Sequence, residues 1–435
     1  MDRDIGGRAV QPLRALFVVP VFSCAGNTGG GQRTLHLYQA LAQFCEVDVL
    51  LVSEPQFASL EALYPQLHRK LFSEAREIHL RRSTAARPSR HALGRWLRRA
   101  LNVLRPPRRS YEPTPEALHH LDAMLARTRY DFIVGRYLMQ TSQSGVLARA
   151  AAPVLVDVDD RDDKVLETRL HSPTTPRLHK PLLRWRLGRT RVLVEQLLER
   201  CAHIWLASDV DRQEVRHPSK SVLPNVPYLQ DIADRHRVDT PSSKTCVFVG
   251  TYVHRVNREG VLHFVQQCWP AIHRAQPDAC LRVVGSGGWT EMQAELERHP
   301  GVKVVGAVPS MADEYRAAAF AVVPLFEGSG TKIKVLESLL FGRTLVAHAH
   351  AVRGLGELRH GQSLLVAQSD EQMVAHCLAL FADPQAARDM AAHGREIVER
   401  EYSFARFAQI VREDALDLLA ARSERDGETV AEGRG

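Results

Sequence analysis

The chain has 435 residues, of which 45% are hydrophobic and 25% are charged. These proportions are typical of soluble globular proteins and exclude disordered, fibrous and collagen-like chains. A single hydrophobic core stops growing near about 250 to 300 residues, so the length predicts two or three domains. No run of 18 apolar residues occurs and charges precede the first apolar stretch, so we expect a cytoplasmic protein without a secretory signal.

Short apolar runs separated by amphipathic stretches predict parallel strands that are covered by helices on both faces. The first series comprises residues 15–20, 47–52, 77–80, 132–135, 154–158, 204–207 and 221–223. The second series comprises residues 246–250, 281–285, 302–306, 320–325 and 344–347. The pattern predicts an α/β protein with two doubly wound, Rossmann-like domains.

Residues 224–244 contain three prolines and no sustained apolar period, so they predict a linker, and we place the domain boundary near residue 240. The polar, glycine-rich C-terminal end and the N-terminal end are expected to be disordered. The predicted divisions are 1–12 (disordered), 13–240 (first domain), 241–400 (second domain), 401–422 (a terminal helix) and 423–435 (disordered).

The net charge of +7 comes from one basic segment, residues 69–109. This segment has thirteen Lys or Arg residues and two acids, which gives +11 and leaves −4 for the rest of the chain. Apolar side chains recur within it at helical spacing, so we expect peripheral binding to an anionic inner membrane face. A solvated basic helix is the alternative. Nucleic acid is not an expected partner, because no zinc or aromatic-interleaved pattern accompanies the charge.

The seven cysteines are scattered along the chain and form no CxxC pair. No His/Cys cluster has the spacing of metal ligands, and most of the cysteines lie in apolar stretches. We therefore expect reduced core thiols and no metal site.

The loop after the strand at 320–325 is the most informative passage, because ligands of open α/β sheets bind outside the carboxyl ends of strands. Small residues at 328–330 let a ligand approach the backbone N–H groups at a helix start, where the helix dipole favours an anion. Lys334 adds a cation one turn into that helix, and Glu337 lies about 4.5 Å further along the axis, where a carboxylate can accept from ribose hydroxyls. We expect Ser338 on the same open face and Gly342 at the helix end. The alternative is a glycine turn followed by a surface Lys/Glu pair.

Several sequence blocks together resemble the family 4 retaining glycosyltransferases of the GT-B fold. They are VFVGTYVHRVNREGVLHFV, LRVVGSGG, VKVVGAV and AVVPLFEGSGTKIKVLESLLFGRTLVAHAHAVRGLGEL. The resemblance implies two Rossmann-like domains facing across a cleft, with a C-terminal helix that crosses back to the first domain. It also implies a nucleotide-sugar donor on the second domain, a saccharide or lipid-linked acceptor on the first, and neither metal nor cofactor.

The resemblance carries over to this chain residue by residue. Glu337 matches the glutamate that holds the donor ribose, and Lys334 lies in the helix start that faces the diphosphate. Arg255, with His254 beside it, occupies a loop that contacts the donor phosphates. The other residues with donor-binding roles are Asn257, Gly285, Val308, Gly328, Ser329, Gly330 and Thr331. In the first domain, Gly29, Gly30 and Gly31 resemble the glycine loop that faces the diphosphate and the acceptor.

Two positions depart from the family pattern. Ser329 stands where most members have a glutamate that contacts the transferred sugar, and Glu327 comes two residues too early to replace it. Asp159 and Asp160 stand where many members have a His-Asp pair, so we place them among the catalytic residues beside Lys334 and Arg255. The alternatives for this acidic run are a solvated strand end and a cation site, since carboxylates suit hard ions.

The expected function is transfer of a hexose-type sugar, with retention, from a nucleoside diphosphate donor to a saccharide or lipid-linked acceptor, in cell-surface polysaccharide or glycan synthesis. The enzyme would act by positioning two substrates and stabilising diphosphate charge. Two alternatives stay open: a GT-B sugar-nucleotide epimerase, and a catalytically silent scaffold that binds sugar nucleotides.

Overall fold

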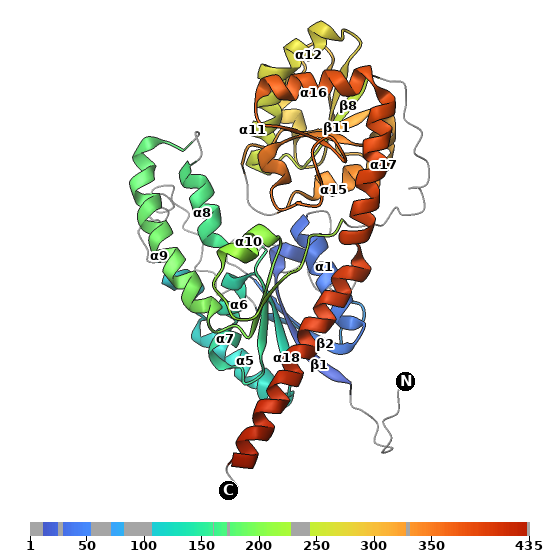
Figure 1. Ribbon diagram of the computed structural model, residues 1–435. Helices are drawn as coiled ribbons and strands as arrows, with labels where there is room; N and C mark the ends of the chain where they lie inside the picture. Colours follow the sequence, from blue (N-terminus) through green and yellow to red (C-terminus); the bar gives the residue numbers. More distant parts are fainter. Residues whose placement is uncertain are drawn as a thin grey trace. The chain divides into compact units, whose positions relative to one another are not determined.

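The chain divides into two compact units in the computed structural model (Figure 1), which describes residues 12–24, 29–53, 71–81, 107–159, 161–171, 175–227, 244–327 and 331–432. Unit 1 comprises Met1–Leu223 with Phe407–Gly435, and unit 2 comprises Pro224–Arg406. The division after Leu223 precedes the boundary that we expected near residue 240. Most of the basic segment 69–109 lies outside the described residues, as do Asp160, Gly328, Ser329 and Gly330.

Unit 1 is built on one sheet of seven parallel strands in the order β3-β2-β1-β4-β5-β6-β7. Its strands are β1 (Leu13–Pro20), β2 (Cys45–Val52), β3 (Ile78–Arg81), β4 (Phe132–Arg136), β5 (Val154–Asp157), β6 (His203–Leu206) and β7 (Lys220–Val222). All seven correspond to the predicted apolar runs. Residues 15–19 of the central strand β1 are wholly buried, because helices cover the sheet on both faces.

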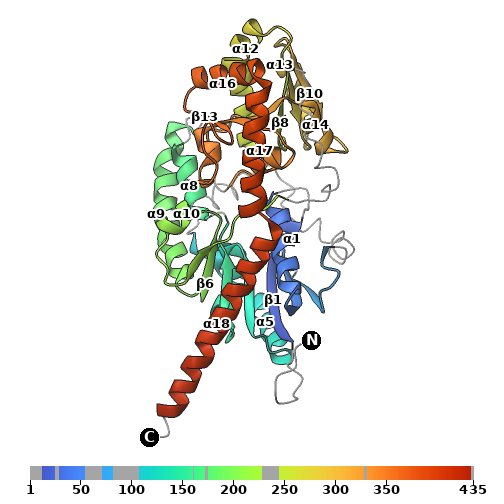
Figure 2. The same ribbon diagram turned by 45° about the vertical axis from the view of Figure 1, so that its right-hand side comes forward.

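The helices of unit 1 are α1 (Gly29–Ala42), α4 (Arg108–Tyr111), α5 (Pro115–Arg127), α6 (Leu138–Ser144), α7 (Val146–Arg149), α8 (Asp162–His171), α9 (Lys180–Leu198) and α10 (Asp209–Glu214). Short 3-10 turns span Val21–Cys24 and Arg177–His179. Side chains of α5, α6, α7 and α9 pack with Leu16 and Val18 of β1 in one core on one face of the sheet. Helix α1 lies on the other face (Figure 2).

Unit 2 is built on one sheet of six parallel strands in the order β10-β9-β8-β11-β12-β13. Its strands are β8 (Thr245–Val249), β9 (Cys280–Val284), β10 (Val302–Gly306), β11 (Phe320–Val323), β12 (Leu345–His348) and β13 (Leu365–Ala367). The sequence predicted the first five. It missed the edge strand β13, which is only three residues long and mostly half-buried, although residues 364–367 form a short apolar run.

The helices of unit 2 are α11 (Arg255–His263), α12 (Trp269–Ala275), α13 (Gln293–Leu296), α14 (Met311–Ala317), α15 (Ile333–Leu340), α16 (Asp370–Ala382) and α17 (Pro384–Glu401). A π-helical turn, Phe264–Cys268, joins α11 to α12, and 3-10 turns span Trp289–Met292 and Ala349–Val352. Trp269 and Trp289 are buried in the core of this unit. The sheet and helices form a second doubly wound domain, as predicted.

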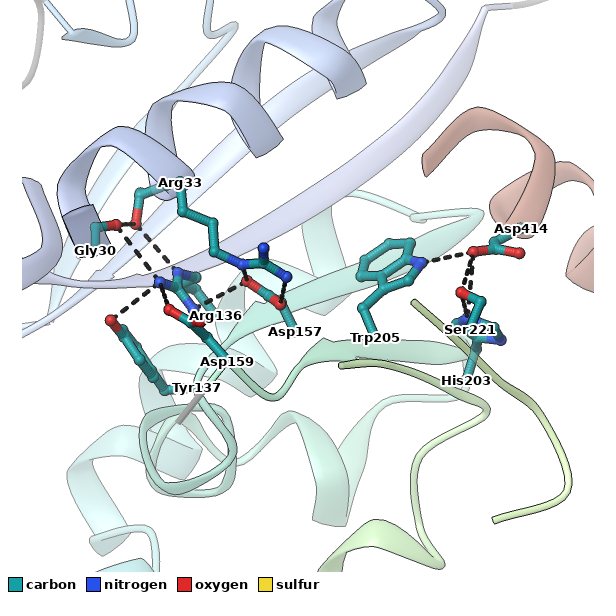
Figure 3. A network of polar contacts seen from close by, with 11 residues as sticks. Gly30, Arg33, Arg136, Tyr137, Asp157, Asp159, His203, Trp205, Ser221 and Asp414 are labelled. Carbon is teal, nitrogen blue, oxygen red and sulfur yellow. Dashed lines mark hydrogen bonds and ion pairs between the residues drawn. The ribbon is translucent and has the colours of Figure 1, made fainter. Parts of the chain in front are cut away.

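The C-terminal helix α18 (Phe404–Glu432) packs on unit 1 although it follows unit 2 in the chain. Asp414 accepts hydrogen bonds from Trp205 Nε1 at 2.7 Å and from Ser221 Oγ at 2.6 Å (Figure 3). The helix runs past residue 422 to Glu432, so residues 423–432 are helical and not disordered as we expected. Within the described part of the chain, no helix is both long and apolar enough to span a bilayer.

Candidate active site

Both sheets reverse their strand order once, between β1 and β4 in unit 1 and between β8 and β11 in unit 2. In open α/β sheets, ligands bind outside the carboxyl ends of strands at such a reversal. In unit 2, β8 leads into Gly250 and α11, while β11 leads towards α15. The two helices that start at this point carry Asn257 and Lys334, respectively.

Lys334, in the first turn of α15, reaches back to the loop that follows β8. Its Nζ atom donates a hydrogen bond of 2.7 Å to Asn257 Oδ1 and lies 4.6 Å from the ring centroid of Phe248. The amide Nδ2 of Asn257 donates to the Thr251 carbonyl at 2.8 Å, so the side chain has a fixed orientation. The structure therefore brings together two residues that we predicted as donor ligands.

Gly250 makes this approach possible because it has no side chain. A Cβ atom there would lie 2.7 Å from Lys334 Nζ and 2.8 Å from Asn257 Nδ2. Gly285, with φ of +145°, faces the same loop, and a Cβ atom on it would lie 2.0 Å from the Gly250 carbonyl oxygen. Trp289 Nε1 donates to that oxygen at 2.7 Å. Gly250 and Gly285 therefore allow the two loops to lie close to each other and to the Lys334 ammonium.

The electrostatics of this place favour an anion. Burial, with a smaller effect of Lys332, lowers the pKa of Lys334 to about 7, while Glu337 opposes the shift. Burial raises the pKa of Glu337, and Lys334 opposes that shift. Burial and the neighbouring cations also lower the pKa of His254. A bound polyanion would supply the negative charge that the Lys334 ammonium lacks.

Arg255 is engaged with acids of its own unit. Its guanidinium forms ion pairs with Glu259, at 2.6 Å, and with Glu327. The Glu327 side chain is only 15% exposed, so this pair fixes Glu327, in the loop after β11, beside the start of α11. The sequence placed Glu327 two residues too early to replace the glutamate that contacts the sugar, and it did not predict the pair with Arg255. A single acid just after a buried strand could have indicated that Glu327 has a basic partner.

The remaining predicted residues of unit 2 are distributed as follows. Thr331 lies just before α15, and Val308 follows β10 and packs against the core of the unit. Gly342, with φ of +68°, follows the end of α15 as expected. Ser338 was predicted on the open face, which is wrong: it is buried, and its hydroxyl donates to the Arg343 carbonyl at 2.8 Å.

In unit 1, Gly29, Gly30 and Gly31 form the first turn of α1 and not a loop. Within this turn, a Cβ atom on Gly30 would lie 2.7 Å from the Tyr137 hydroxyl. The Gly30 carbonyl accepts from Thr34 Oγ1 at 2.9 Å and, at 3.5 Å, from Arg136 (Figure 3). The glycine run therefore permits close contact with the residues that follow β4.

A buried ion-pair network lies directly beneath that turn. Arg33 holds Asp157 with two bonds of 2.9 and 2.6 Å, and Arg136 contacts Asp157 at 2.9 Å and Asp159 at 2.8 Å. Arg33, Arg136 and Asp157 are almost completely buried. Two cations face two anions, so the network is close to neutral and needs no further ion.

This network gives Asp159 a definite partner. Its side chain is 10% exposed and bonded to Arg136, so it is not a solvated strand end. The sequence interpretation missed Arg33 and Arg136. Both arginines occupy positions that the sequence could have indicated. Arg33 comes just after the glycine run. Arg136 ends the apolar strand β4, and Asp157 ends the neighbouring strand β5.

Tyr137 is held in an unfavourable backbone conformation next to the network. Its φ of 62° is the only positive value of a non-glycine residue within the described chain. The guanidinium carbon of Arg136 lies 3.8 Å from its ring centroid, and Arg136 donates to its hydroxyl at 3.0 Å. Such strain persists where the surroundings over-determine it, which is common at functional sites.

The described acids that follow β5 are paired with protein groups. Asp162 accepts from the Tyr111 hydroxyl at 2.6 Å, and Asp163 pairs with Arg161 at 2.7 Å. Among the residues that the structure describes, no group of three His, Cys, Asp or Glu is arranged to hold a metal ion.

Comparison with solved structures identifies the fold as GT-B. Sucrose-phosphate synthase from Thermosynechococcus elongatus matches with a TM-score of 0.65 and 17% identity, over 94% of this chain and 100% of that one. HepE from Anabaena, in complex with UDP, gives a TM-score of 0.60 and 15% identity, over 92% and 99% of the two chains. The lipopolysaccharide outer core galactosyltransferase WaaB gives 0.58 and 11%, over 93% and 99%. At these identities the likeness shows the fold alone.

The sequence match is confined to unit 2. Residues 243–383 match the family described as glycosyl transferases group 1, which confirms the resemblance over the part that carries Lys334, Asn257 and Glu337. None of the curated proteins compared with the chain matches it. The chain thus has a GT-B fold, and residues 243–383 of unit 2 are similar to the glycosyl transferases group 1 family.

Proposed function

We propose that the protein is a retaining glycosyltransferase that uses a nucleoside diphosphate sugar. The observation that carries this proposal is the Lys334 ammonium, buried and bonded to Asn257 at the strand-order reversal of a unit similar to the glycosyl transferases group 1 family. A diphosphate at the start of α15 would meet this cation and the N–H groups of the first helical turn.

Different neighbouring residues would bind different parts of the donor. Glu337 would hold the ribose hydroxyls, and Val308 would lie near the base. Arg255 is paired with Glu259 and Glu327, so it would have to exchange one of these acids for the diphosphate in order to contact the donor. UDP is the first nucleotide to test, because HepE has been solved with UDP, with UDP-glucose, and with UDP and glucose.

Chemistry at such a site depends on charge stabilisation. As the bond between sugar and diphosphate breaks, negative charge accumulates on the leaving diphosphate, and Lys334 stabilises it without a metal. The acceptor hydroxyl attacks from the side of the leaving group and passes its proton to the diphosphate, so the anomeric configuration is retained. Since no protein nucleophile is required, catalysis is mainly the positioning of two substrates.

Unit 1 would hold the acceptor at the start of α1, above the network of Arg33 and Arg136. We propose a saccharide or lipid-linked acceptor of cell-surface glycan synthesis, reached from the cytoplasmic side, with residues 69–109 at the membrane. Asp159 is proposed to act near this site as the partner of Arg136.

A donor panel tests the proposal. The protein is incubated with UDP- and GDP-sugars in the presence of EDTA, and donor hydrolysis, transfer and epimerised sugar are scored separately. Hydrolysis or transfer of one donor is the expected result. Epimerised nucleotide sugar would establish the epimerase instead, and binding without turnover the silent scaffold. A site that binds no nucleoside diphosphate would contradict all three.

A further inference from the structure

Helix α9 and the 3-10 turn before it carry a repeated pair of an arginine and an apolar residue. The pairs are Arg177-Leu178, Arg184-Trp185 and Arg191-Val192, each seven residues after the last. Seven residues are about two turns of an α-helix, so residues at this spacing share a face. Residues 175–192 contain six Lys or Arg and no acid.

The apolar members of these pairs are exposed. Leu178 is 92% exposed, Trp185 41% and Val192 54%. The opposite side of the helix packs into the core through Leu187 and Val194. The exposed apolar residues are therefore not the core-facing residues of this helix. With α8 it forms a pair of helices that projects from the sheet of unit 1 (Figures 1 and 2).

Cations surround this exposed stripe. Arg184 and Arg189 are exposed, and the Arg189 guanidinium carbon lies 5.7 Å from the ring centroid of Trp185. Arg191 pairs with Glu167 of α8 at 3.0 Å. Arginine stems beside a tryptophan extend the apolar surface while their charged ends stay in water.

We propose that this surface, defined by Arg177, Leu178, Arg184, Trp185, Arg189 and Val192, binds an anionic lipid bilayer. Basic residues alone would bind any polyanion. Binding of nucleic acid, however, does not explain an exposed leucine and an exposed valine on the same face. An acidic lipid surface satisfies both properties, because apolar side chains enter the acyl boundary while arginines meet the headgroups. Tryptophan favours this boundary, where one end is apolar and the other is wet.

This inference is separate from sugar transfer and from the basic segment 69–109. It can hold for any acceptor, and its residues belong to a different part of unit 1. Vesicles of phosphatidylcholine with phosphatidylglycerol therefore test it directly on the full chain, with pure phosphatidylcholine vesicles as the neutral comparison.

Co-sedimentation compares two variants with the wild type. Leu178→Ser/Trp185→Ser removes the apolar contacts, and Arg177→Gln/Arg184→Gln removes two charges. One charge near an anionic surface changes partitioning about fivefold, so the arginine variant, which loses two charges, should bind about 25-fold more weakly at low salt. The apolar variant should lose about tenfold or more. Arg274→Gln/Arg298→Gln removes the same charge from exposed positions of unit 2 and should bind like the wild type.

Tryptophan fluorescence assigns the contact to this surface. Trp205, Trp269 and Trp289 are buried, so in Trp96→Phe the exposed Trp185 is the reporter. Brominated phosphatidylglycerol should quench Trp96→Phe, and the additional change Trp185→Phe should abolish the quenching. Unaltered thermal unfolding shows that the variants are folded.

Three outcomes would overturn the proposal. The first is a wild-type protein that does not bind anionic vesicles at low salt. The second is quenching that survives the loss of Trp185, which would transfer membrane contact to another segment. The third is an apolar variant that binds vesicles normally while the arginine variant loses affinity for DNA and vesicles alike, which would identify a surface for soluble polyanions.

Discussion

Lys334 Nζ and Asn257 Oδ1 are joined by a hydrogen bond of 2.7 Å although the two residues are 77 positions apart in the chain. The bond ties the start of α15 to the start of α11 on either side of the strand-order reversal. Its acceptor is a neutral amide, so the bond orients the ammonium without neutralising it. A cation that is oriented but not neutralised is suited to a diphosphate.

Gly250→Ala should displace that cation. The added methyl group would lie 2.7 Å from Lys334 Nζ and 2.8 Å from Asn257 Nδ2, so both side chains must shift; both contacts are with side-chain ends, so the fold should survive. We expect UDP affinity to fall about tenfold, the loss of roughly one charge-assisted hydrogen bond. Isothermal titration measures the affinity. Gly356→Ala, where a Cβ atom meets nothing within 4 Å, is the matched control, and equal affinity in both variants would contradict the geometry.

Nucleotide binding should take up a proton above neutral pH. Because the pKa of free Lys334 is lowered to about 7, the amine is largely neutral at pH 8. A bound diphosphate favours the charged form and raises this pKa, so up to one proton enters on binding. Affinity should then decrease as pH rises from about 7.5 to 9, a range in which the phosphates are already ionised.

Calorimetry in two buffers of different ionisation enthalpy counts this proton. The uptake at pH 8 should disappear in Lys334→Met and persist in Lys303→Gln, which removes an exposed lysine from the same unit. A wild-type protein that binds UDP without proton uptake at pH 8 would show that Lys334 does not meet the diphosphate.

Glu337→Gln should weaken ribonucleotides selectively. The variant keeps the shape and one acceptor oxygen but loses the charge that accepts strongly from two hydroxyls. UDP should lose about 1.5 to 3 kcal/mol of binding free energy, while 2′,3′-dideoxy-UDP should bind the variant and the wild type alike. Parallel titrations of both nucleotides check this. Equal losses for the two would place Glu337 away from the ribose.

Arg136→Met should destabilise unit 1 strongly. It leaves Asp157 and Asp159 buried with one cation fewer, and removing one partner of a buried ion pair costs about 3 to 5 kcal/mol of unfolding free energy. Arg14→Gln breaks a pair whose side chains are 45% and 38% exposed, and should cost about 1 kcal/mol or less. Urea unfolding compares them, and a similar small loss in both would refute a structural role for the network.

The sequence predicted the parts of this protein that depend on local pattern. Buried parallel strands give continuous apolar runs, so the strands from β1 to β12 were visible, and Gly342 marked the end of α15. Strand β13 was missed although residues 364–367 form a short apolar run. Ser338 was misplaced because helical spacing alone does not show which polar residue finds an acceptor in the following turn, here the Arg343 carbonyl.

The sequence predicted only those parts of the site whose residues lie close together in the chain. Lys334 and Glu337 share one helix and could be read together. The contact between Lys334 and Asn257, and the network of Arg33, Arg136, Asp157 and Asp159, join distant segments at strand ends. Such contacts depend on the order of the strands in the sheet, and the apolar pattern of a single strand does not show that order.

The most direct test of the account is isothermal titration of Lys334→Ala with UDP and GDP in the presence of EDTA. The wild type should bind at least one of the two nucleotides without metal. The variant should lose about ten- to a hundredfold in affinity for whichever nucleotide the wild type binds, since the ammonium meets the diphosphate and not the base. Undiminished affinity in Lys334→Ala, or wild-type binding that requires a metal ion, would contradict the site described above.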